Sequence, residues 1–400
     1  MNKITFLHCG DLHLGCMPNH LEERYEDFFK SFDMLIQDAI ENSCRYILIS
    51  GDLFHLKVIN SRTLLKVLEL LEKAKKSNIK VLVIEGNHDK AFYVDEKSWL
   101  EFLHSRYYIT LLKHKIINGK FVLDESSIYE DEDIRVIGIG YLGSATSLYI
   151  KDICKKIQKS KKYTILMMHA AINRLCGEDM GDVSIDKMEP LQEIVDYVAL
   201  GHIHTKYEYN NVFYNPGSLE NIRLKDGKKS NKKGYFIVSV EEKKHTVVFK
   251  ESVKRKVSNI SINLKDKTDL EEVIRYLKNY KYDLNEGEIL ELTLYGNVPF
   301  NPYLINIEEL RKTIKEKYRL LYVEISNLIN IINTEKDMSN FVDIKAIEEE
   351  TIKDYISVNY PTLKENNELI NEVLDLKNRL IENEDYDEII SKMLTKGGSL

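Results

Sequence analysis

The feature that most constrains the fold is an alternation, in the first half of the chain, of short apolar runs with helical patterns. Five runs, at residues 4–7, 46–49, 81–84, 164–167 and 197–200, are continuous and mostly rich in β-branched residues. Such runs are typical of strands buried on both faces. Apolar residues spaced along one helix face lie between them, at 28–40 and 64–71. The alternation predicts an α/β fold.

A polar cluster directly follows each of the five runs. The clusters are Asp11 with His13, Asp52 with His55, Asn87 with His88 and Asp89, His169 alone, and His202 with His204. In open α/β sheets a ligand site lies beyond the carboxyl ends of the strands, which is where these clusters fall. Oxygen and imidazole groups are the ligands that divalent transition metals prefer. The clusters therefore predict a metal site.

Seven of these side chains suffice for two ions if one carboxylate is shared. The predicted ligands are Asp11, His13, Asp52, Asn87, His169, His202 and His204. Asp52 is the predicted shared carboxylate, because a bridging oxygen holds two cations about 3.5–4 Å apart. Asn87 offers a neutral oxygen, which avoids excess negative charge beside a phosphate substrate. Glycines that precede four clusters are predicted to permit tight turns: Gly10, Gly51, Gly86 and Gly201.

Composition indicates an intracellular protein of two or three domains. The chain has 400 residues, of which 43% are hydrophobic. Its apolar runs are shorter than a membrane span, and its start lacks a signal-peptide pattern. The five cysteines form no CxxC motif, so we expect a reducing cytoplasm and mostly buried free thiols.

The net charge of −7 is concentrated at the end of the chain. Residues 341–400 hold 14 acidic and 7 basic side chains, which leaves 50 of each sign in residues 1–340. The acidic excess therefore says little about a catalytic surface. Two basic clusters can either track phosphates or be solvated loops. They are Arg223, Lys225, Lys228, Lys229, Lys232 and Lys233, and the run Lys254, Arg255 and Lys256.

The order of the motifs (D-x-H, GD, GNHD, H, GHxH) resembles the calcineurin-like metallophosphoesterase superfamily over about residues 4–220. The resemblance implies a four-layer α/β/β/α sandwich that holds two divalent ions, commonly manganese. It assigns the first ion to Asp11, His13, Asp52 and His204, and the second to Asp52, Asn87, His169 and His202.

Three further features resemble the SbcD family of nucleases and its Mre counterpart in archaea and eukaryotes. His55 completes a GDLFH motif, residues 214–220 read YNPGSLE, and about 150 residues follow the catalytic unit. Small phosphodiesterases also carry NPGS. The resemblance implies a manganese-dependent DNA exonuclease and endonuclease, with 3′–5′ exonuclease and single-strand endonuclease activity. It also implies a homodimer that acts in DNA double-strand-break repair with an SbcC-like coiled-coil ATPase, in the nucleoid-containing cytoplasm.

The resemblance extends to the domain organisation. Residues 1–252 are expected to form the nuclease domain and residues 253–330 a small α/β capping domain that touches DNA. Strand, helix, strand, helix and strand are predicted at 257–264, 269–279, 289–294, 306–317 and 320–325. Residues 331–400 form a predicted helical, acidic region with an apolar stripe at Leu369, Val373, Leu376 and Leu380. This stripe either packs on the chain's own capping domain or binds the ATPase.

The predicted reaction is hydrolysis of a phosphodiester by a metal-activated hydroxide. His88 is expected to protonate the leaving 3′ oxygen, with Asp89 fixing the tautomer of His88. By resemblance, His55 orients the scissile phosphate. The same resemblance makes Trp99, Phe102 and Leu103 candidates for a dimer interface.

Two other classes of function stay open. A phosphatase or phosphodiesterase acting on a small molecule or protein would share the ligands, although the long C-terminal addition argues against it. A non-catalytic scaffold predicts eroded ligands, and none is missing.

Overall fold

The computed structural model describes residues 3–92, 94–175, 181–223, 232–332 and 352. Six of its strands form a first sheet in the order β16-β15-β1-β2-β3-β4. They are β1 (Ile4–Cys9), β2 (Tyr46–Ile49), β3 (Lys80–Ile84), β4 (Thr110–Leu112), β15 (Gly234–Glu241) and β16 (Lys244–Glu251). Strands β1 to β4 run parallel, and β15 pairs antiparallel with both β1 and β16. The strands predicted at 4–7, 46–49 and 81–84 are confirmed.

A second six-stranded sheet has the order β13-β14-β12-β9-β8-β7. Its strands are β7 (Ile128–Glu130), β8 (Ile134–Ile139), β9 (Tyr163–His169), β12 (Tyr197–Gly201), β13 (Tyr207–Tyr209) and β14 (Phe213–Asn215). The four central strands are parallel, whereas β7 and β13 run antiparallel to their neighbours. Two short strand pairs accompany the sheets. They are β5 (Lys115–Ile117) with β6 (Lys120–Val122), and β10 (Ile172–Asn173) with β11 (Val183–Ser184).

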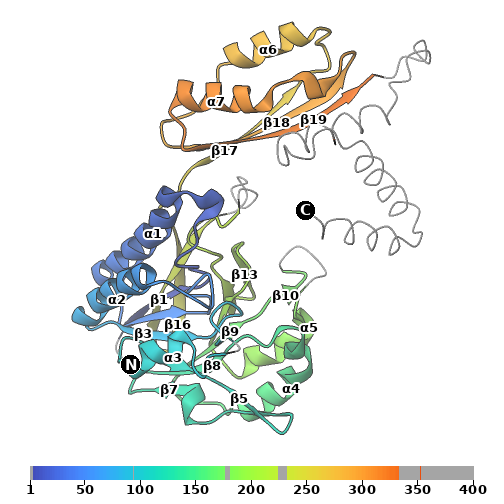
Figure 1. Cartoon of the computed structure of the whole chain (residues 1–400). Coiled ribbons are helices and arrows are strands. Elements are labelled where there is room, and N and C mark those ends of the chain that lie inside the picture. Colours follow the sequence, from blue (N-terminus) through green and yellow to red (C-terminus); the bar gives the residue numbers. More distant parts are fainter. Residues whose placement is uncertain (1–2, 93, 176–180, 224–231, 333–351, 353–400) are drawn as a thin grey trace, which may run out of the picture. The chain divides into compact units, whose positions relative to one another are not determined.

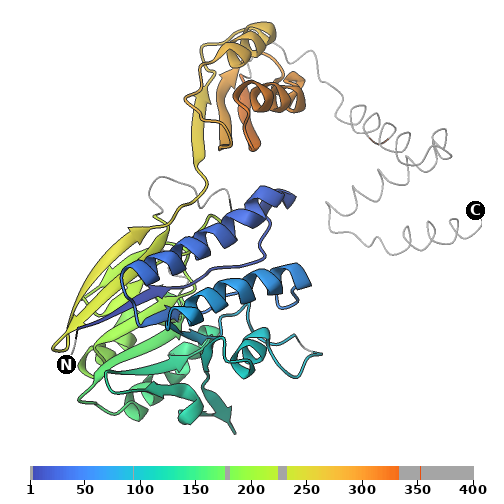
Figure 2. The ribbon, with the colours of Figure 1, turned by 90° about the vertical axis from the view of Figure 1, so that its left-hand side faces the viewer.

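Helices cover the outer face of each sheet, which gives four layers (Figures 1 and 2). The helices α1 (Glu22–Glu41), α2 (Ser61–Lys76) and α3 (Trp99–Ser105) pack on the first sheet, and α4 (Thr146–Lys156) and α5 (Ile185–Met188) on the second. Short 3-10 turns are η1 (Pro18–His20), η2 (Glu125–Ser127), η3 (Gly143–Ala145), η4 (Glu189–Glu193) and η6 (Pro302–Leu304). The predicted four-layer sandwich is confirmed.

The side-chain alternation of the strands builds the layers. In β1, Phe6 points into the core between the two sheets, while Leu7 and Cys9 join the core under α1 and α2. Because both faces of the strand are buried, apolar residues occur on both faces, and the sequence shows no strict alternation of apolar and polar residues. Phe28 and Phe32 of α1 are fully buried, and each such burial contributes roughly 1.5–3 kcal/mol to folding.

The C-terminal part of the described chain is a small α/β unit. A three-stranded sheet β17-β18-β19 accompanies two helices that contact each other. The elements are β17 (Val257–Asn263), α6 (Leu270–Asn279), β18 (Ile289–Val298), α7 (Ile307–Tyr318) and β19 (Tyr322–Ile331). The five elements predicted here are confirmed in type and order, although β18 and β19 extend further than expected.

The contacts divide the chain into two units. The first combines Met1–Gly296 with Pro302–Ile329, and the second combines Asn297–Asn301 with Asn330–Leu400. The predicted boundary at residue 253 falls inside the first unit and stays a prediction. Nearly all of the acidic tail, residues 331–400, lies outside the described residues, including the apolar stripe that begins at Leu369.

Two expectations from composition can be compared with this fold. Cys9, Cys16 and Cys44 are free and buried, as predicted for most of the thiols, and Cys154 is free and half-buried; Cys176 lies outside the described residues. Within the described ranges, no helix combines the length and apolar character that crossing a membrane requires.

Candidate metal centre

The polar clusters meet where the parallel strands of both sheets end. Asp11 follows β1 and Asp52 follows β2, and their loops are tied by backbone hydrogen bonds from Asp11 N to Gly51 O (3.1 Å) and from His13 N to Asp52 O (3.0 Å). His169 is the last residue of β9 in the second sheet, and the backbone N–H of His202, after β12, donates to both carboxylate oxygens of Asp11 (3.0 and 3.1 Å). Asp11 therefore joins the two sheets at this edge.

Two overlapping groups of side chains offer ligand atoms that all lie within 4.8 Å of one another. One group is Asp11, His13 and His204, and the other is Asp11, Asp52 and His169. The first matches three of the four ligands predicted for the first ion. The second contains Asp52 and His169, which were predicted for the second ion, but adds Asp11 to them.

Asp52 lies between the histidines of the two groups. Its Oδ2 is 3.7 Å from His13 Nε2 and 3.4 Å from His169 Nε2. A carboxylate in this place can reach cations on either side, so the position fits the shared role expected of Asp52. Asn87 Oδ1 lies 3.2 Å from His169 Nε2, on the side of the second ion.

The donor set fits divalent cations. Asp11 and Asp52 are almost fully buried, and buried carboxylates require compensating positive charge. His13 Nε2 and His204 Nε2 face each other at 3.2 Å, an arrangement in which both lone pairs can be directed at one cation. Mixed imidazole and carboxylate donors suit manganese, iron or zinc better than calcium.

Burial and neighbouring charges shape the protonation of the ligands. Burial raises the pKa of Asp11 to about 7, against the opposing effect of nearby His169. Burial also acts to raise the pKa of Asp52, but His169 and His13 outweigh it and hold this pKa well below its usual value. Burial would lower the pKa of His169, yet the adjacent Asp52 carboxylate raises it to about 9. A proton on His169 thus supplies positive charge that a bound cation would replace, so metal binding should release protons.

Burial lowers the pKa of His13 well below its usual value. It likewise lowers the pKa of His202, with a further contribution from neighbouring His169. Both imidazoles are therefore neutral near pH 7, which is the form that binds metals.

Backbone conformation at the ligands is unusual. Four of the seven predicted ligand residues have left-handed φ angles: Asp11 (51°), His13 (46°), Asp52 (53°) and His202 (93°). Non-glycine residues pay conformational energy for this geometry, which is concentrated at functional sites. The local strain therefore lies in the ligand residues themselves.

The adjacent glycines serve mainly to allow close approach. A Cβ on Gly86 would lie 2.0 Å from Asp52 Oδ1, and one on Gly51, whose φ is +92°, would lie 2.3 Å from His169 Nδ1. A Cβ on Gly10 would meet only ordinary contacts from 3.5 Å outward. The prediction of a turn that requires glycine is thus wrong for Gly10, since its backbone and surroundings accept a side chain.

Hydrogen bonds orient the ligands from behind. His169 Nδ1 lies 2.7 Å from the carbonyl oxygen of Ser50, so Nδ1 carries the hydrogen and Nε2 is left to bind an ion. The backbone N–H of His88 donates to Asp52 Oδ1 (2.9 Å), which leaves Oδ2 directed at the histidines.

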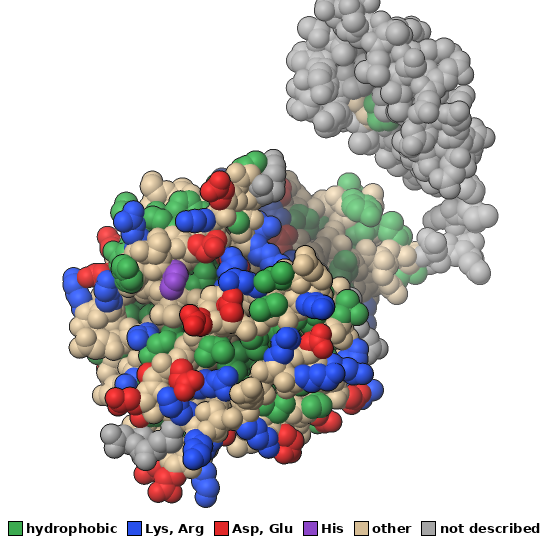
Figure 3. Space-filling view, turned by 90° about the horizontal axis from the view of Figure 1, so that it is seen from below, with side chains coloured by type: hydrophobic (Ala, Val, Ile, Leu, Met, Phe, Trp, Pro, Cys, Tyr) green, Lys and Arg blue, Asp and Glu red, His purple; other side chains and the backbone are tan. Residues whose placement is uncertain are grey.

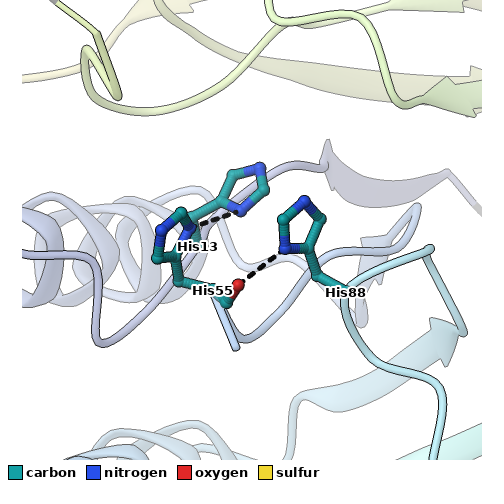
Figure 4. Close-up of side chains that lie close together, drawn as sticks. All are labelled: His13, His55 and His88. Atoms are coloured by element: carbon teal, nitrogen blue, oxygen red, sulfur yellow. Dashed lines mark hydrogen bonds between the residues drawn. The ribbon is translucent and has the colours of Figure 1, made fainter. Parts of the chain in front are cut away.

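His55 and His88 lie beside the ligand groups as a stacked pair. Their ring centroids are 5.5 Å apart with an interplanar angle of 16°. His88 Nδ1 is 2.6 Å from the carbonyl oxygen of His55, and His55 Nδ1 is 3.4 Å from His13 Nδ1 (Figure 4). Because Nδ1 of His88 donates to that carbonyl, its Nε2 is the nitrogen left for proton transfer. Together with His13, the pair also forms a third group of potential metal ligands.

Asp89 does not perform the role expected of it. Its carboxylate accepts hydrogen bonds from the backbone N–H groups of Leu53, Phe54 and Gly86 (3.0–3.2 Å). The tautomer of His88 is instead fixed by the carbonyl of His55. The side chains of adjacent residues often point apart, and here Asp89 is buried beneath the loops that carry Asp52 and Asn87.

Two residues near the centre have no counterpart among the predicted ones. Asp182 Oδ2 lies 3.8 Å from His202 Nε2, and the ring of Tyr141 lies 5.1 Å from that of His202. Lys90 lies 5.3 Å from the centroid of the Tyr141 ring. Neither Asp182 nor Tyr141 belongs to a recognisable motif, so only their position in the fold could have revealed them.

The basic clusters are less available to phosphates than their sequence suggested. Lys233 is fully buried, and Arg255 Nε pairs with Asp27 Oδ2 at 2.6 Å. Lys232 is exposed and pairs with Glu251 (3.0 Å), while residues 225, 228 and 229 lie outside the described residues. On the face drawn in Figure 3, positive and negative side chains are interspersed.

One candidate for a dimer interface is wrong. Leu103 is fully buried in the core of its own chain, so it has no surface to offer a second copy. Trp99 and Phe102 are partly buried, with rings in an edge-to-face contact 5.9 Å apart, and stay candidates.

Comparison with known proteins identifies the family of the chain. The model of the calcineurin-like phosphoesterase family matches residues 4–206, which include all seven predicted ligands. The DNA double-strand break repair protein Mre11 of Archaeoglobus fulgidus is 27% identical over 238 residues, which are 56% of this chain and 52% of that protein. Its namesake in Methanocaldococcus jannaschii is 26% identical over 404 residues, 97% of this chain and 98% of that protein. The namesake in Sulfurisphaera tokodaii is 24% identical and covers 78% of each chain.

These relatives confirm the resemblance to SbcD and Mre nucleases that the motifs predicted. The family match covers half of the chain and includes the ligand groups and eight of the twelve strands of the two sheets, namely β1 to β4, β7 to β9 and β12. The chain therefore belongs to the calcineurin-like phosphoesterase family and is a metal-dependent phosphoesterase.

Proposed function

We propose that the chain is a manganese-dependent DNA nuclease that acts in double-strand-break repair. The observation that carries the proposal is the similarity to the Methanocaldococcus jannaschii repair protein, which extends over 97% of this chain and thus through the C-terminal α/β unit. A phosphoesterase that acts on a small molecule would not need that unit. Two similar proteins cover 78% or more of the chain under the same name.

In this proposal Asp11, His13, Asp52 and His204 would hold one ion, and Asp52, Asn87, His169 and His202 the other. The donor set described above supports this division, with Asp11 close enough to the second group to contribute there as well. When bound, the two ions would polarise the phosphoryl oxygens and lower the pKa of the attacking water. Manganese suits such mixed nitrogen and oxygen ligands.

The chain's own residues would position the diester and supply a proton. His88 donates through Nδ1 to the carbonyl of His55, so a proton on Nε2 is the one available to the leaving 3′ oxygen. Burial and neighbouring His88 lower the pKa of His55, which keeps its ring neutral near pH 7. If His13 binds its ion through Nε2, its Nδ1 hydrogen can point to His55 Nδ1. The remaining N–H of His55 would then be free to donate to a phosphate oxygen.

The experiment is a comparison of substrates. Purified chain with manganese should release nucleotides from linear duplex DNA, with 3′–5′ polarity, and cut single strands. Asp52→Asn, which removes the shared charge, serves as the background control for a contaminating nuclease. Hydrolysis of bis-p-nitrophenyl phosphate without activity on any DNA would favour the alternative, a phosphodiesterase or phosphatase for a small molecule or protein.

We further propose that the chain works as a homodimer in complex with an SbcC-like coiled-coil ATPase, in the compartment that holds the DNA. The acidic tail with its apolar stripe would be the contact for the ATPase. Copurification of the native chain with its partners, identified by mass spectrometry, tests this. A chain truncated after residue 332 that still binds the ATPase would contradict the role of the tail.

A further inference from the structure

The backbone that carries His204 accepts hydrogen bonds from two buried side chains, one at the end of β14 and one just before β15. Asn215 Nδ2, at the end of β14, donates to the carbonyl oxygens of Ile203 (2.7 Å) and Thr205 (2.9 Å). Lys233 Nζ, just before β15, donates to the carbonyl oxygen of His204 itself (2.8 Å). Three consecutive carbonyl groups around one metal ligand are thus held from below.

One acceptor atom in this arrangement, Asn215 Oδ1, is buried without a partner among the described residues. Asn215 and Lys233 are both fully buried. Because Asn215 Nδ2 faces two carbonyl oxygens, Oδ1 must point the other way, and among the described residues it has no hydrogen-bond partner. A buried unpaired acceptor is unfavourable, and leucine would fill a similar volume without it. The two hydrogen bonds that Asn215 donates thus come together with a buried unpaired acceptor, which lowers the stability of the fold.

The loop that includes Ser218 completes the arrangement. Ser218 Oγ lies 2.9 Å from Lys233 Nζ, and the backbone N–H of Ser218 lies 3.4 Å from the carbonyl oxygen of His204. Gly217, at φ +77°, allows this approach, because a Cβ there would lie 2.7 Å from that carbonyl oxygen. The segment YNPGSLE thus packs against the backbone of the cluster that contains His202 and His204.

We propose that Asn215 and Lys233 are positioning residues for His204, and that they set the affinity of the ion held by His13 and His204. His204 has no strand around it to fix its backbone, since it lies beyond the end of β12. Asn215 and Lys233, which we call the clamp, supply that constraint. His204 Nε2 is thereby held 3.2 Å from His13 Nε2 before an ion binds. This inference rests on the two-ion centre of the proposed function.

The test is calorimetric titration of the metal-free full chain with manganese. Substitution of a residue that orients a metal ligand typically lowers the metal affinity on the order of 10- to 100-fold. We expect Asn215→Leu and Lys233→Met to weaken the binding of the ion at His13 and His204 by about this factor. The affinity for the other ion should not change. The half-activating manganese concentration should rise equally, with kcat recovering at saturating metal.

The sign for Lys233→Met separates positioning from charge. Lys233 also lowers the pKa of Asp11, so the titration is done well above pH 7, where Asp11 is ionised in both proteins. Removing a positive charge near a cation site should then, through Coulomb repulsion alone, strengthen binding. Weaker binding therefore supports positioning, and unchanged or tighter binding overturns it for Lys233. Lys232→Met is the matched control, because Lys232 is adjacent in sequence, exposed, and forms an ion pair with Glu251. This variant should bind both ions normally.

Other outcomes remain decisive. Wild-type protein that binds no ion would refute the two-ion centre itself, whereas two ions bound equally by wild type and both variants would refute only the clamp. If Asn215→Leu does not fold, Ser218→Ala replaces it, since this variant removes a single hydroxyl, which accepts from Lys233 Nζ and donates to the carbonyl oxygen of Glu220. It should weaken the same ion several-fold, and unchanged affinity would overturn the proposal.

Discussion

The role of His88 can be tested by changing the leaving group rather than the metal. His88→Asn keeps a donor for the carbonyl oxygen of His55, which His88 Nδ1 contacts at 2.6 Å, but has no proton to give. Loss of a general acid typically lowers the rate on the order of 10²- to 10⁴-fold. This corresponds to about 3–5 kcal/mol of lost transition-state stabilisation.

The loss should depend on the substrate. The 3′ oxygen of DNA leaves as a poor alkoxide and needs a proton, whereas p-nitrophenolate is stable as an anion. We therefore expect His88→Asn to lose activity on DNA by about the full factor and activity on bis-p-nitrophenyl phosphate by only a few-fold. Turnover of both substrates is measured at saturating manganese.

Metal binding provides the control for this variant. His88 is not in either ligand group that contains Asp11, so His88→Asn should bind two manganese ions with wild-type affinity in calorimetry. Equal losses on both substrates would refute the role as a proton donor. Loss of an ion would show that the third group, His13 with His55 and His88, is a ligand set.

Two more perturbations follow from the structure. Gly86→Ala places a Cβ 2.0 Å from Asp52 Oδ1 and should abolish binding of both ions. Gly10→Ala, beside Asp11, adds a Cβ with contacts only from 3.5 Å outward, so this control should bind both ions. Equal calorimetric titrations of the two variants would show that close packing at Asp52 is not required for the metal centre. Burial lowers the pKa of His8 to about 3. Below pH 6.5 the unfolded chain therefore binds a proton at His8 that the folded chain does not bind. The free energy of unfolding then falls by up to about 1.4 kcal/mol per pH unit as the pH decreases. In urea titrations of metal-free protein between pH 6.5 and 5, His8→Gln should therefore lose less unfolding free energy than wild type. Equal losses in the two proteins would show that His8 is not the origin of this pH dependence.

The strands that carry the ligands could be predicted from sequence because burial on both faces leaves a continuous apolar run. Residues 46–49 are an example: Ile47 and Ile49 face the helices while Leu48 faces the other sheet. The ligands followed from the same pattern, since each run ends in a polar cluster. The geometry that gathers them needed no knowledge of long-range contacts beyond the rule for strand ends.

The supporting residues could not be predicted in this way. Asp89 appeared to belong to His88 because the two are adjacent in sequence, but its carboxylate binds the backbone of three other residues. Lys233 appeared to be part of a basic surface cluster, but it is buried under His204. In both cases the direction of a side chain depends on packing between elements distant in sequence, which local pattern does not encode.

The central claim is that two cations occupy one pocket with Asp52 between them. The direct measurement is an anomalous-difference map from crystals of the chain grown with manganese, collected at the manganese absorption edge. We expect two peaks about 3.5–4 Å apart, one beside His13 and His204 and one beside Asn87 and His169, with the Asp52 carboxylate reaching both. A single peak, or two peaks that Asp52 does not join, would contradict the account.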